Sequence, residues 1–485
     1  MGTKRVAIVG GGYSGLAAFW ALKDSDYDVH LFEASDQIGS LMNYAPFEID
    51  GREVQINTAV NVFNPSTSPN LLAFLRELGI PHTTREFSFS SSQIDGSFEW
   101  SFRSIYYTLL QVRSLMRQDT LWMLFDVTRF NHFALDVLRV DMATGPVQTV
   151  REYLAAQGYC DTFRDNYIVP LMTIFWNIHR LDDALDVPMA SLVRFLWDND
   201  MLQRFTMWPR WSTVNAGPGD FEEAGRKAVS QGTINLNARV ESVKSGSQGD
   251  QLFLQLTSDR VEIFDHVILA TSGQDAFNIM ALEGTDEEIQ LLGEFLSTRV
   301  VSILHSDVSL MPKKKSTWAA FNHLASPLQN SFSISYFANL LQGFPSWLFC
   351  PMFITPNPLT PPHPASLQGI SEYSCPVFNA KSLYAQRRLS QIQNTRGISY
   401  CGPWTGFGLY EDGIRSAFEV AVKHLGAQLP FEVVPASANN RPIPPLTPED
   451  MRARRWLQLP FRRKSKRLVI PEQRCGTQIS AVGIE

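Results

Sequence analysis

The sequence predicts an α/β protein in which a parallel sheet is interrupted by a large inserted α+β domain. Two observations lead to this prediction. A strand, a glycine-rich turn, a helix and a second strand follow one another at the N-terminus, and a similar strand, turn and helix return after residue 396. The segments between them are rich in aromatic residues, and 485 residues with 44% hydrophobic side chains suffice for two substantial cores.

The N-terminal segment carries a nucleotide-binding fingerprint. Residues 5–9 form a short β-branched run, which is typical of a buried parallel strand, and GxGxxG follows at positions 10–15. The first glycine permits a tight turn, the second lets the backbone approach a pyrophosphate, and the third lets helix and strand pack closely. The helix N-terminus stabilises phosphate charge. A Rossmann-type site is therefore expected at Gly10, Gly12, Ser14 and Gly15.

The residues after the second strand favour FAD over NAD. That strand ends at Glu33, whose carboxylate is expected to accept hydrogen bonds from the adenosine ribose. The run from Ala34 to Ser40 resembles the E-A-x-x-x-x-G-G extension of many FAD enzymes, with Ser40 in place of the second glycine. A strand-rich segment at 232–270 is expected to bring Val240 against the adenine. Gly217-Pro218-Gly219 follows no β-branched strand, so a second nucleotide site for NADPH is not expected.

The strand, turn and helix at 397–418 are expected to contact the flavin. The N-terminus of this helix would stabilise negative charge on the flavin ring. Tyr410 is a candidate proton donor or substrate-positioning residue, and Trp404 a candidate wall of the flavin pocket. The alternative for both is ordinary packing of an aromatic side chain. The remaining predicted contacts are Gly402, Asp412, Gly413 and Ile414.

Charge and cysteine usage exclude several classes. The net charge of −6 argues against nucleic acid as a partner. Five widely spaced cysteines form neither a disulfide framework nor a metal-ligand pattern, which favours a reducing cytoplasm. We find no signal peptide and no uninterrupted apolar span. From Met451 onward basic residues outnumber acidic ones, so this tail is either a solvated extension or a weak contact with anionic membranes.

The three blocks in this order resemble the flavin-containing amine oxidase superfamily over roughly residues 5–425. The closer likeness is to a branch of bacterial and fungal NAD/FAD-binding proteins, which looks related to the oxidase-like N-terminal domain of plant cyclopropane fatty acid synthases. The further motifs that carry the resemblance are Trp211-Ser212-Thr213-Val214, Leu304-His305-Ser306-Asp307, Trp318-Ala319-Ala320-Phe321-Asn322, Cys375-Pro376-Val377-Phe378 and Gly408 to Ser416.

Three positions depart from the pattern of these relatives. Asn57 stands where relatives tend to have the aspartate of V-D-T-G, so a carboxylate on the flavin side is missing. Tyr410 replaces the histidine of G-F-H-E-D-G, and Cys375 replaces the histidine of H-P-V-F. Chemistry that depends on those histidines does not carry over to this chain.

The resemblance implies a discontinuous FAD-binding domain with an inserted substrate domain and a C-terminal extension. A helix is expected over 68–79 with Ser68 as its cap, and the proline-rich stretch at 351–364 is expected to be a loop. The expected FAD-binding segments are 1–85, 215–285 and 395–430, the substrate-domain segments are 86–214 and 286–394, and the proline-rich linker and basic tail are 431–485.

The implied activity is that of an FAD-dependent oxidoreductase, an oxidase or desaturase. An aromatic-rich substrate domain suits an apolar small molecule such as a lipid, polyketide or terpenoid. A hydride would pass from this substrate to the flavin, and molecular oxygen would reoxidise it. Fungal secondary metabolite biosynthesis is one expected setting. The alternatives are a redox-neutral double-bond isomerase, an amine oxidase, and a non-catalytic accessory protein stabilised by flavin.

Overall fold

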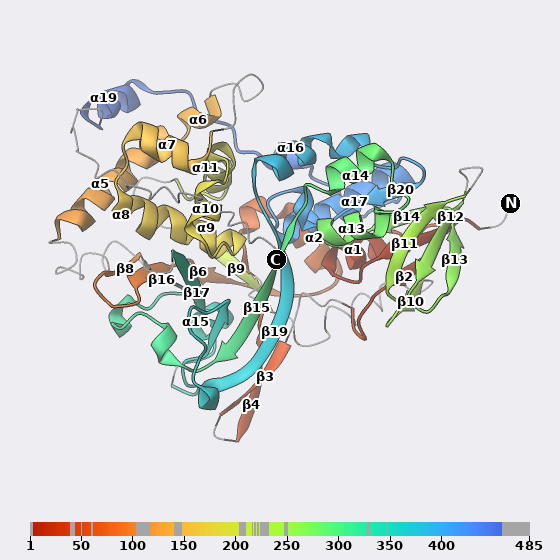
Figure 1. Cartoon of the computed structure of the whole chain (residues 1–485), viewed down its shortest axis with the longest axis horizontal. Helices are drawn as coiled ribbons and strands as arrows, with labels where there is room; N and C mark the ends of the chain where they lie inside the picture. Colours follow the sequence, from red (N-terminus) through yellow and green to blue (C-terminus); the bar gives the residue numbers. More distant parts are fainter. Residues whose placement is uncertain are drawn as a thin grey trace, which may run out of the picture. The chain divides into compact units, whose positions relative to one another are not determined.

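The structure is a computed structural model (Figure 1). The chain divides into two units. Residues 1–445 form one compact unit, and residues 446–485 form the second, which contains α19 (Pro448–Leu457). The described residues are 3–38, 44–49, 51–59, 62–102, 117–139, 148–202, 210–215, 217, 220, 223, 232–246, 251–326, 330–345 and 347–457. None of the helices in these ranges has the length and hydropathy needed to cross a bilayer.

A five-stranded sheet assembles from three distant parts of the chain in the order β10-β2-β1-β14-β20. Every neighbouring pair in it is parallel. Its strands β1 and β14 are apolar after their first residues, Arg5 and His266, because both faces of the sheet are covered. The strands are β1 (Arg5–Val9), β2 (Asp28–Phe32), β10 (Thr233–Asn235), β14 (His266–Leu269) and β20 (Ile398–Tyr400).

The helices around this sheet come from distant parts of the chain. On one face α1 and α17 pack against each other and share one apolar core with α2. The other face carries a second core with α13, α14 and the antiparallel strands β11, β12 and β13. These elements are α1 (Tyr13–Ala21), α2 (Pro69–Glu77), α13 (Gly273–Met280), α14 (Asp286–Leu292), α16 (Ala380–Arg388), α17 (Tyr410–Leu425), β11 (Val240–Ser245), β12 (Leu252–Leu256) and β13 (Val261–Phe264).

A seven-stranded sheet with helices against it forms the other half of the unit. Its order is β19-β15-β18-β17-β16-β7-β8, and only the β16–β7 pair is parallel among these strands. Aromatic side chains dominate the core between this sheet and the helices. Its elements are β7 (Phe89–Gln93), β8 (Glu99–Phe102), β15 (Ser297–His305), β16 (Phe321–Ser326), β17 (Ser331–Phe337), β18 (Phe353–Pro356), β19 (Leu367–Pro376), α5 (Gln118–Phe133), α7 (Val150–Gln157), α9 (Val169–Trp176), α11 (Met189–Asp198) and α15 (Ala338–Gln342).

Two small sheets connect these halves. The first is the hairpin of β3 (Tyr44–Ile49) with β4 (Arg52–Asn57), and the second has the order β5-β9-β6. The strands of the second sheet are β5 (Val62–Phe63), β6 (His82–Glu86) and β9 (Arg210–Val214). The expected mixed α/β class is therefore confirmed.

Two local predictions need correction. The stretch 351–364 is not all loop, because β18 lies inside it and pairs with β15 and β17. Its prolines flank or end the strand, so they remove few ladder hydrogen bonds. The helix expected over 68–79 exists as α2, yet the Ser68 side chain makes no capping hydrogen bond. The buried carboxylate of Glu411 caps α2 instead and accepts from the backbone amide of Leu71 at 2.9 Å.

Candidate functional site

A cleft of about 580 Å³ opens where β1, β2 and β14 end. The carboxyl ends of parallel strands are the usual ligand-binding edge of such a sheet. Glycines from the turn after β1 form its floor, and residues after β2 and β14 form its sides. The lining residues are Val9, Gly10, Gly12, Tyr13, Ser14, Phe32, Glu33, Ala34, Ala238, Arg239, Val240, Glu241, Ala270, Thr271, Ser272, Asp275, Asn278, Ile279, Ser374 and Pro403.

The glycines of the N-terminal turn are required by close contacts. Gly10 has φ +103°, and a Cβ there would lie 2.8 Å from the carbonyl oxygen of Ala270. A Cβ on Gly15 would lie 1.8 Å from the carbonyl oxygen of Gly10. Gly12 is the extended N-cap residue of α1 and lines the cleft. The turn therefore holds α1 directly below the cleft.

The N-terminus of α1 presents donors to this cleft. It has no side-chain cap, so its first amides lack an intrahelical partner. The Ser14 hydroxyl is buried in the first turn and has no hydrogen-bond partner in the described structure. Uncapped amides, a positive helix end and an unpaired hydroxyl fit a phosphate group.

Glu33, Ala34 and Val240 meet at one side of the cleft, although they are far apart in sequence. The Glu33 carboxylate accepts from the Gly11 amide at 2.6 Å and still faces the cleft. The loop after β10 is held close because the amide of Ala238 donates to the carbonyl of Glu33 at 2.8 Å. This hydrogen bond holds the start of β11 near the end of β2, and Val240 lines the cleft there.

Trp404 lies behind the cleft rather than in its lining. Its indole N–H donates to the carbonyl oxygen of Thr271 at 3.0 Å, and its ring packs 4.5 Å from that of Phe295. Only 2% of Trp404 is exposed. Only glycine fits at position 402 beside this ring, because a Cβ there would lie 2.5 Å from the indole nitrogen. The packing favours a structural role for Trp404, which holds the Thr271 side of the cleft in place.

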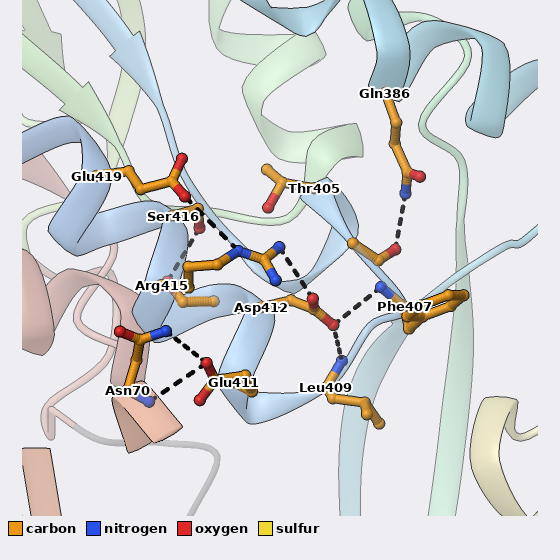
Figure 2. A network of polar contacts seen from close by, with 12 residues as sticks. Asn70, Gln386, Thr405, Phe407, Leu409, Glu411, Asp412, Arg415, Ser416 and Glu419 are labelled. Atoms are coloured by element: carbon orange, nitrogen blue, oxygen red, sulfur yellow. Dashed lines mark hydrogen bonds and ion pairs between the residues drawn. The ribbon is translucent and has the colours of Figure 1, made fainter. Parts of the chain in front are cut away.

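The Asp412 side chain accepts hydrogen bonds from the glycine-containing turn before α17 (Figure 2). Its carboxylate accepts from the amides of Phe407 at 2.9 Å and Leu409 at 3.1 Å, and it pairs with Arg415 at 3.0 Å. A Cβ on Gly406 would lie 2.0 Å from this carboxylate. Its hydrogen bonds therefore hold the turn, and Asp412 is not one of the residues that line the cleft.

Gly413 and Ile414 join α17 to α1. A Cβ on Gly413 would lie 2.3 Å from the Tyr13 ring and 2.4 Å from the Ser14 hydroxyl. Ile414 is fully buried in the core that the two helices share. These two residues therefore support the helix whose N-terminus faces the cleft.

Tyr410 lies one ring behind the cleft. Its ring is 4.8 Å from that of Tyr13, which lines the cleft. Burial raises the pKa of both phenols, and for Tyr410 the neighbouring Cys375 and Tyr44 raise the pKa further. Both phenols are therefore protonated near neutral pH and can donate a hydrogen bond or hold a proton. Burial also raises the pKa of the Cys375 thiol, to about 11, so it is not a thiolate.

A second cavity of about 330 Å³ lies beside Asn57 and was not anticipated as a site. The sequence marked Asn57 only as a departure from related proteins. No local sequence pattern could reveal this cavity, because its wall is built from β3, β4, β9 and α15, which are far apart in the sequence. The lining residues are Tyr44, Gln55, Asn57, Val62, Thr213, Val214, Asn215, Gly217, Leu341, Gln342 and Phe344.

Comparison with known families settles the membership of the chain. Residues 13–283, more than half of its length, match the family described as flavin containing amine oxidoreductase. The chain belongs to this family. It is therefore an FAD-dependent oxidoreductase. No curated protein sequence matches it.

Several solved structures share the fold of this family member at low sequence identity. Putrescine oxidase bound to putrescine has a TM-score of 0.58 at 14% identity, over 87% of this chain and 99% of that one. The CLA-producing fatty acid isomerase from P. acnes has a TM-score of 0.57 at 13% identity, over 87% and 98%. Cyclohexylamine oxidase from Brevibacterium oxydans IH-35A has a TM-score of 0.58 at 13% identity, over 87% and 98%.

Proposed function

We propose that the cleft binds FAD and that the five-stranded sheet is the core of a Rossmann-type FAD-binding domain built from residues 1–85, 215–285 and 395–430. The observation that carries this proposal is the uncapped N-terminus of α1 at the cleft, together with the buried, unpaired hydroxyl of Ser14, one of the residues that line the cleft. A pyrophosphate at this point would satisfy both. Gly12 leaves room for it.

The other residues of the cleft have matching roles in this proposal. Glu33 would accept hydrogen bonds from the ribose hydroxyls, and the backbone at Val240 would face the adenine. Bound FAD supplies a hydride acceptor. The turn at Gly402 and the N-terminus of α17 would hold its ring end. Tyr13 and Tyr410 stay protonated there and can position substrate by donating hydrogen bonds.

We propose further that residues 86–214 and 286–394 form the substrate domain, and that the chain oxidises or desaturates an apolar small molecule, with oxygen as electron acceptor. The aromatic core of this half supports an apolar substrate. Isomerisation of a double bond is the second candidate, since a fatty acid isomerase shares the fold. Amine oxidation, which the family name suggests, is the third.

The test is anaerobic mixing of the yellow holoprotein with panels of lipids, polyketides, terpenoids and amines. Durable loss of flavin absorbance with an apolar compound would support an oxidase or desaturase. Transient loss, together with a shifted double bond in the product, would instead identify an isomerase. Durable loss with amines alone would overturn the apolar substrate, and no loss with any compound would favour a flavin-stabilised accessory protein.

A further inference from the structure

The Asn57 cavity contains a buried donor without a partner. Asn57 is 4% exposed, and its Oδ1 accepts from the amide of Ala59 at 3.0 Å. This contact fixes the orientation of the side-chain amide, so the atom left over is Nδ2. Nδ2 makes no hydrogen bond in the described structure. A buried donor of this kind requires an acceptor, because leaving it unpaired costs about 1–3 kcal/mol.

The backbone at Asn57 is fixed by two hydrogen bonds from one side chain. The Gln342 side chain at the end of α15 accepts from the Asn57 amide at 3.0 Å and donates to the Asn57 carbonyl at 2.8 Å. Gln342 therefore holds the backbone of β4 at Asn57, and the Asn57 side chain lines the cavity. Burial raises the pKa of the nearby Tyr44, the Asn57 side chain lowers it, and the Asp220 carboxylate raises it further, so both side chains lie near the Tyr44 hydroxyl.

The guanidinium of Arg85 lies next to the turn that carries Gln342 and Phe344, although Arg85 is not itself one of the residues that line the cavity. Arg85 and Thr213 share one face of the β6–β9 pair, since Thr83 opposes Thr213 and Arg85 lies two residues further. The Arg85 guanidinium reaches the turn at Gly343, where a Cβ would lie 2.2 Å from its Nη2. Its Nε is buried without a hydrogen-bond partner.

The described lining contains no carboxylate. Its polar side chains are amides and hydroxyls, and its apolar side chains are Val62, Val214, Leu341 and Phe344. The carboxylate of Asp220 lies beside the lining: it accepts from the Gly217 amide at 2.6 Å and raises the pKa of Tyr44, but Asp220 is exposed to solvent. An ammonium group here would be desolvated without a buried counter-ion, whereas an oxygen acceptor would gain the Asn57 donor.

The cavity also adjoins the proposed flavin site. Tyr44 lines it, and Tyr44 lies close enough to Tyr410 to raise the pKa of that phenol. Tyr410 in turn contacts Tyr13 in the wall of the cleft. Tyr44 and Tyr410 therefore lie near each other, and Tyr410 contacts the cleft wall at Tyr13.

We propose that the Asn57 cavity binds the acyl oxygen of the substrate, in a carboxylic acid or a neutral carbonyl compound with an apolar body, and discriminates against protonated amines. Asn57 Nδ2 donates to this oxygen, and Arg85 favours the carboxylate form. The proposal deepens the proposed function, because it names the substrate class of the same enzyme. The role of this contact in catalysis rests on the proposed function, whereas the binding of acyl compounds to the Asn57 cavity does not depend on it.

Calorimetric titration of the full-length holoprotein with octanoate, octanamide and octylamine tests this inference. We expect octanoate or octanamide to bind at least roughly tenfold more tightly than octylamine. Asn57→Asp keeps the shape and the acceptor for Ala59 but replaces the donor, so acyl binding should fall about tenfold or more. Asn440→Asp makes the same chemical change at an exposed position outside the cavity and should leave binding unchanged.

Arg85→Gln separates the two possible ligand sources. Weaker binding of octanoate alone would identify a carboxylate, and unchanged binding of both acyl probes would identify a neutral carbonyl group. Thermal unfolding must show that each variant is folded, and Asn57→Ser replaces Asn57→Asp if the latter is not. Octylamine binding as tightly as octanoate, or Asn57 variants that bind like Asn440→Asp, would overturn the proposal.

Bound FAD, measured on the same samples, distinguishes this failure from failure of the proposed function. Normal flavin content without acyl binding would remove only the Asn57 proposal. Acyl binding to a protein that cannot take up FAD would instead remove the flavin assignment of the cleft.

Discussion

At the scale of single residues, the unpaired hydroxyl of Ser14 indicates that the cleft binds a ligand. It lies in the first turn of α1, where the helix amides are also uncapped. We expect Ser14→Ala to weaken FAD binding roughly tenfold to a hundredfold, as for a hydrogen bond to a charged group. Equilibrium dialysis against FAD measures this loss. Ser316→Ala changes an exposed serine in the same way and should retain the affinity of the unmodified protein.

Glu411 is a buried carboxylate that stabilises another helix. It accepts from the side-chain amide of Asn70 at 2.6 Å (Figure 2). It also accepts from the Leu71 amide at the start of α2. Burial raises its pKa to about 7, more than these hydrogen bonds lower it. The folded protein therefore keeps a proton on Glu411 at pH values where the unfolded chain has lost it.

The sign of the resulting pH dependence follows from linkage. Because the pKa of Glu411 is raised by folding, its contribution to the free energy of unfolding is fully present below the pKa of the unfolded chain, near 4.5. This contribution is lost as the pH rises through the pKa of the folded protein, about 7. From pH 4.5 to 7.5, the unfolding free energy should fall by on the order of 3 kcal/mol more in the unmodified protein than in Glu411→Gln. Denaturant titrations at both pH values measure it. The exposed Glu77→Gln control should follow the unmodified protein, and equal pH dependence of all three would contradict the argument.

Residues whose roles depend on local spacing could be predicted, and residues whose partners are distant could not. The turn at Gly10 to Gly15 follows from short-range geometry, so the sequence located it. Glu411 acts on Leu71, which lies 340 positions earlier in the chain, and no local pattern reveals this contact. The unpaired amide of Asn57 was hidden for the same reason, since α15 and β4 meet only in the folded chain.

At the scale of elements, the packing of α17 on α1 controls the shape of the cleft. Alanine normally stabilises a helix by about 1 kcal/mol relative to glycine. Gly413→Ala should nevertheless destabilise the protein and reduce its FAD content, because the added carbon would lie 2.3 Å from Tyr13. Thermal unfolding and flavin absorbance measure both effects. A variant with a raised melting temperature and full flavin would show that the two helices are not tightly packed at this point.

The elements that the sequence located are those with strong local patterns. β1, α1 and β2 occur where the strand-turn-helix-strand pattern placed them. β18 was misread as loop because its prolines dominate the local composition, whereas its pairing with β15 and β17 is decided by the sheet. Strands inside a large sheet depend on their neighbours more than on propensity.

At the scale of the whole molecule, the parallel sheet draws its strands from residues 5–32, 233–269 and 398–400. The sequence anticipated this discontinuity because the resemblance supplied the order of the blocks. The boundaries between the FAD-binding and substrate segments stay a prediction. Residues 458–485, most of the basic tail, lie outside the described part of the chain, and so do Gly39 and Ser40 of the FAD-type extension.

The tail allows a test of membrane attachment. Its basic residues would attract anionic lipid by about 1 kcal/mol each near the surface. If the tail contacts membranes, the full chain should co-sediment with phosphatidylserine vesicles at low salt and less at high salt, and a chain ending at Glu449 should stay in solution. Equal binding by both proteins, or binding by neither, would leave the tail as a solvated extension.

The central claim is that FAD occupies the cleft above α1, and flavin stoichiometry tests it most directly. The purified protein should contain about one FAD per chain after supplementation. Gly12→Val should be folded by circular dichroism yet nearly colourless, because its side chain would fill the space for the pyrophosphate at the N-cap of α1. A folded Gly12→Val protein that retains stoichiometric FAD would contradict the assignment of this cleft.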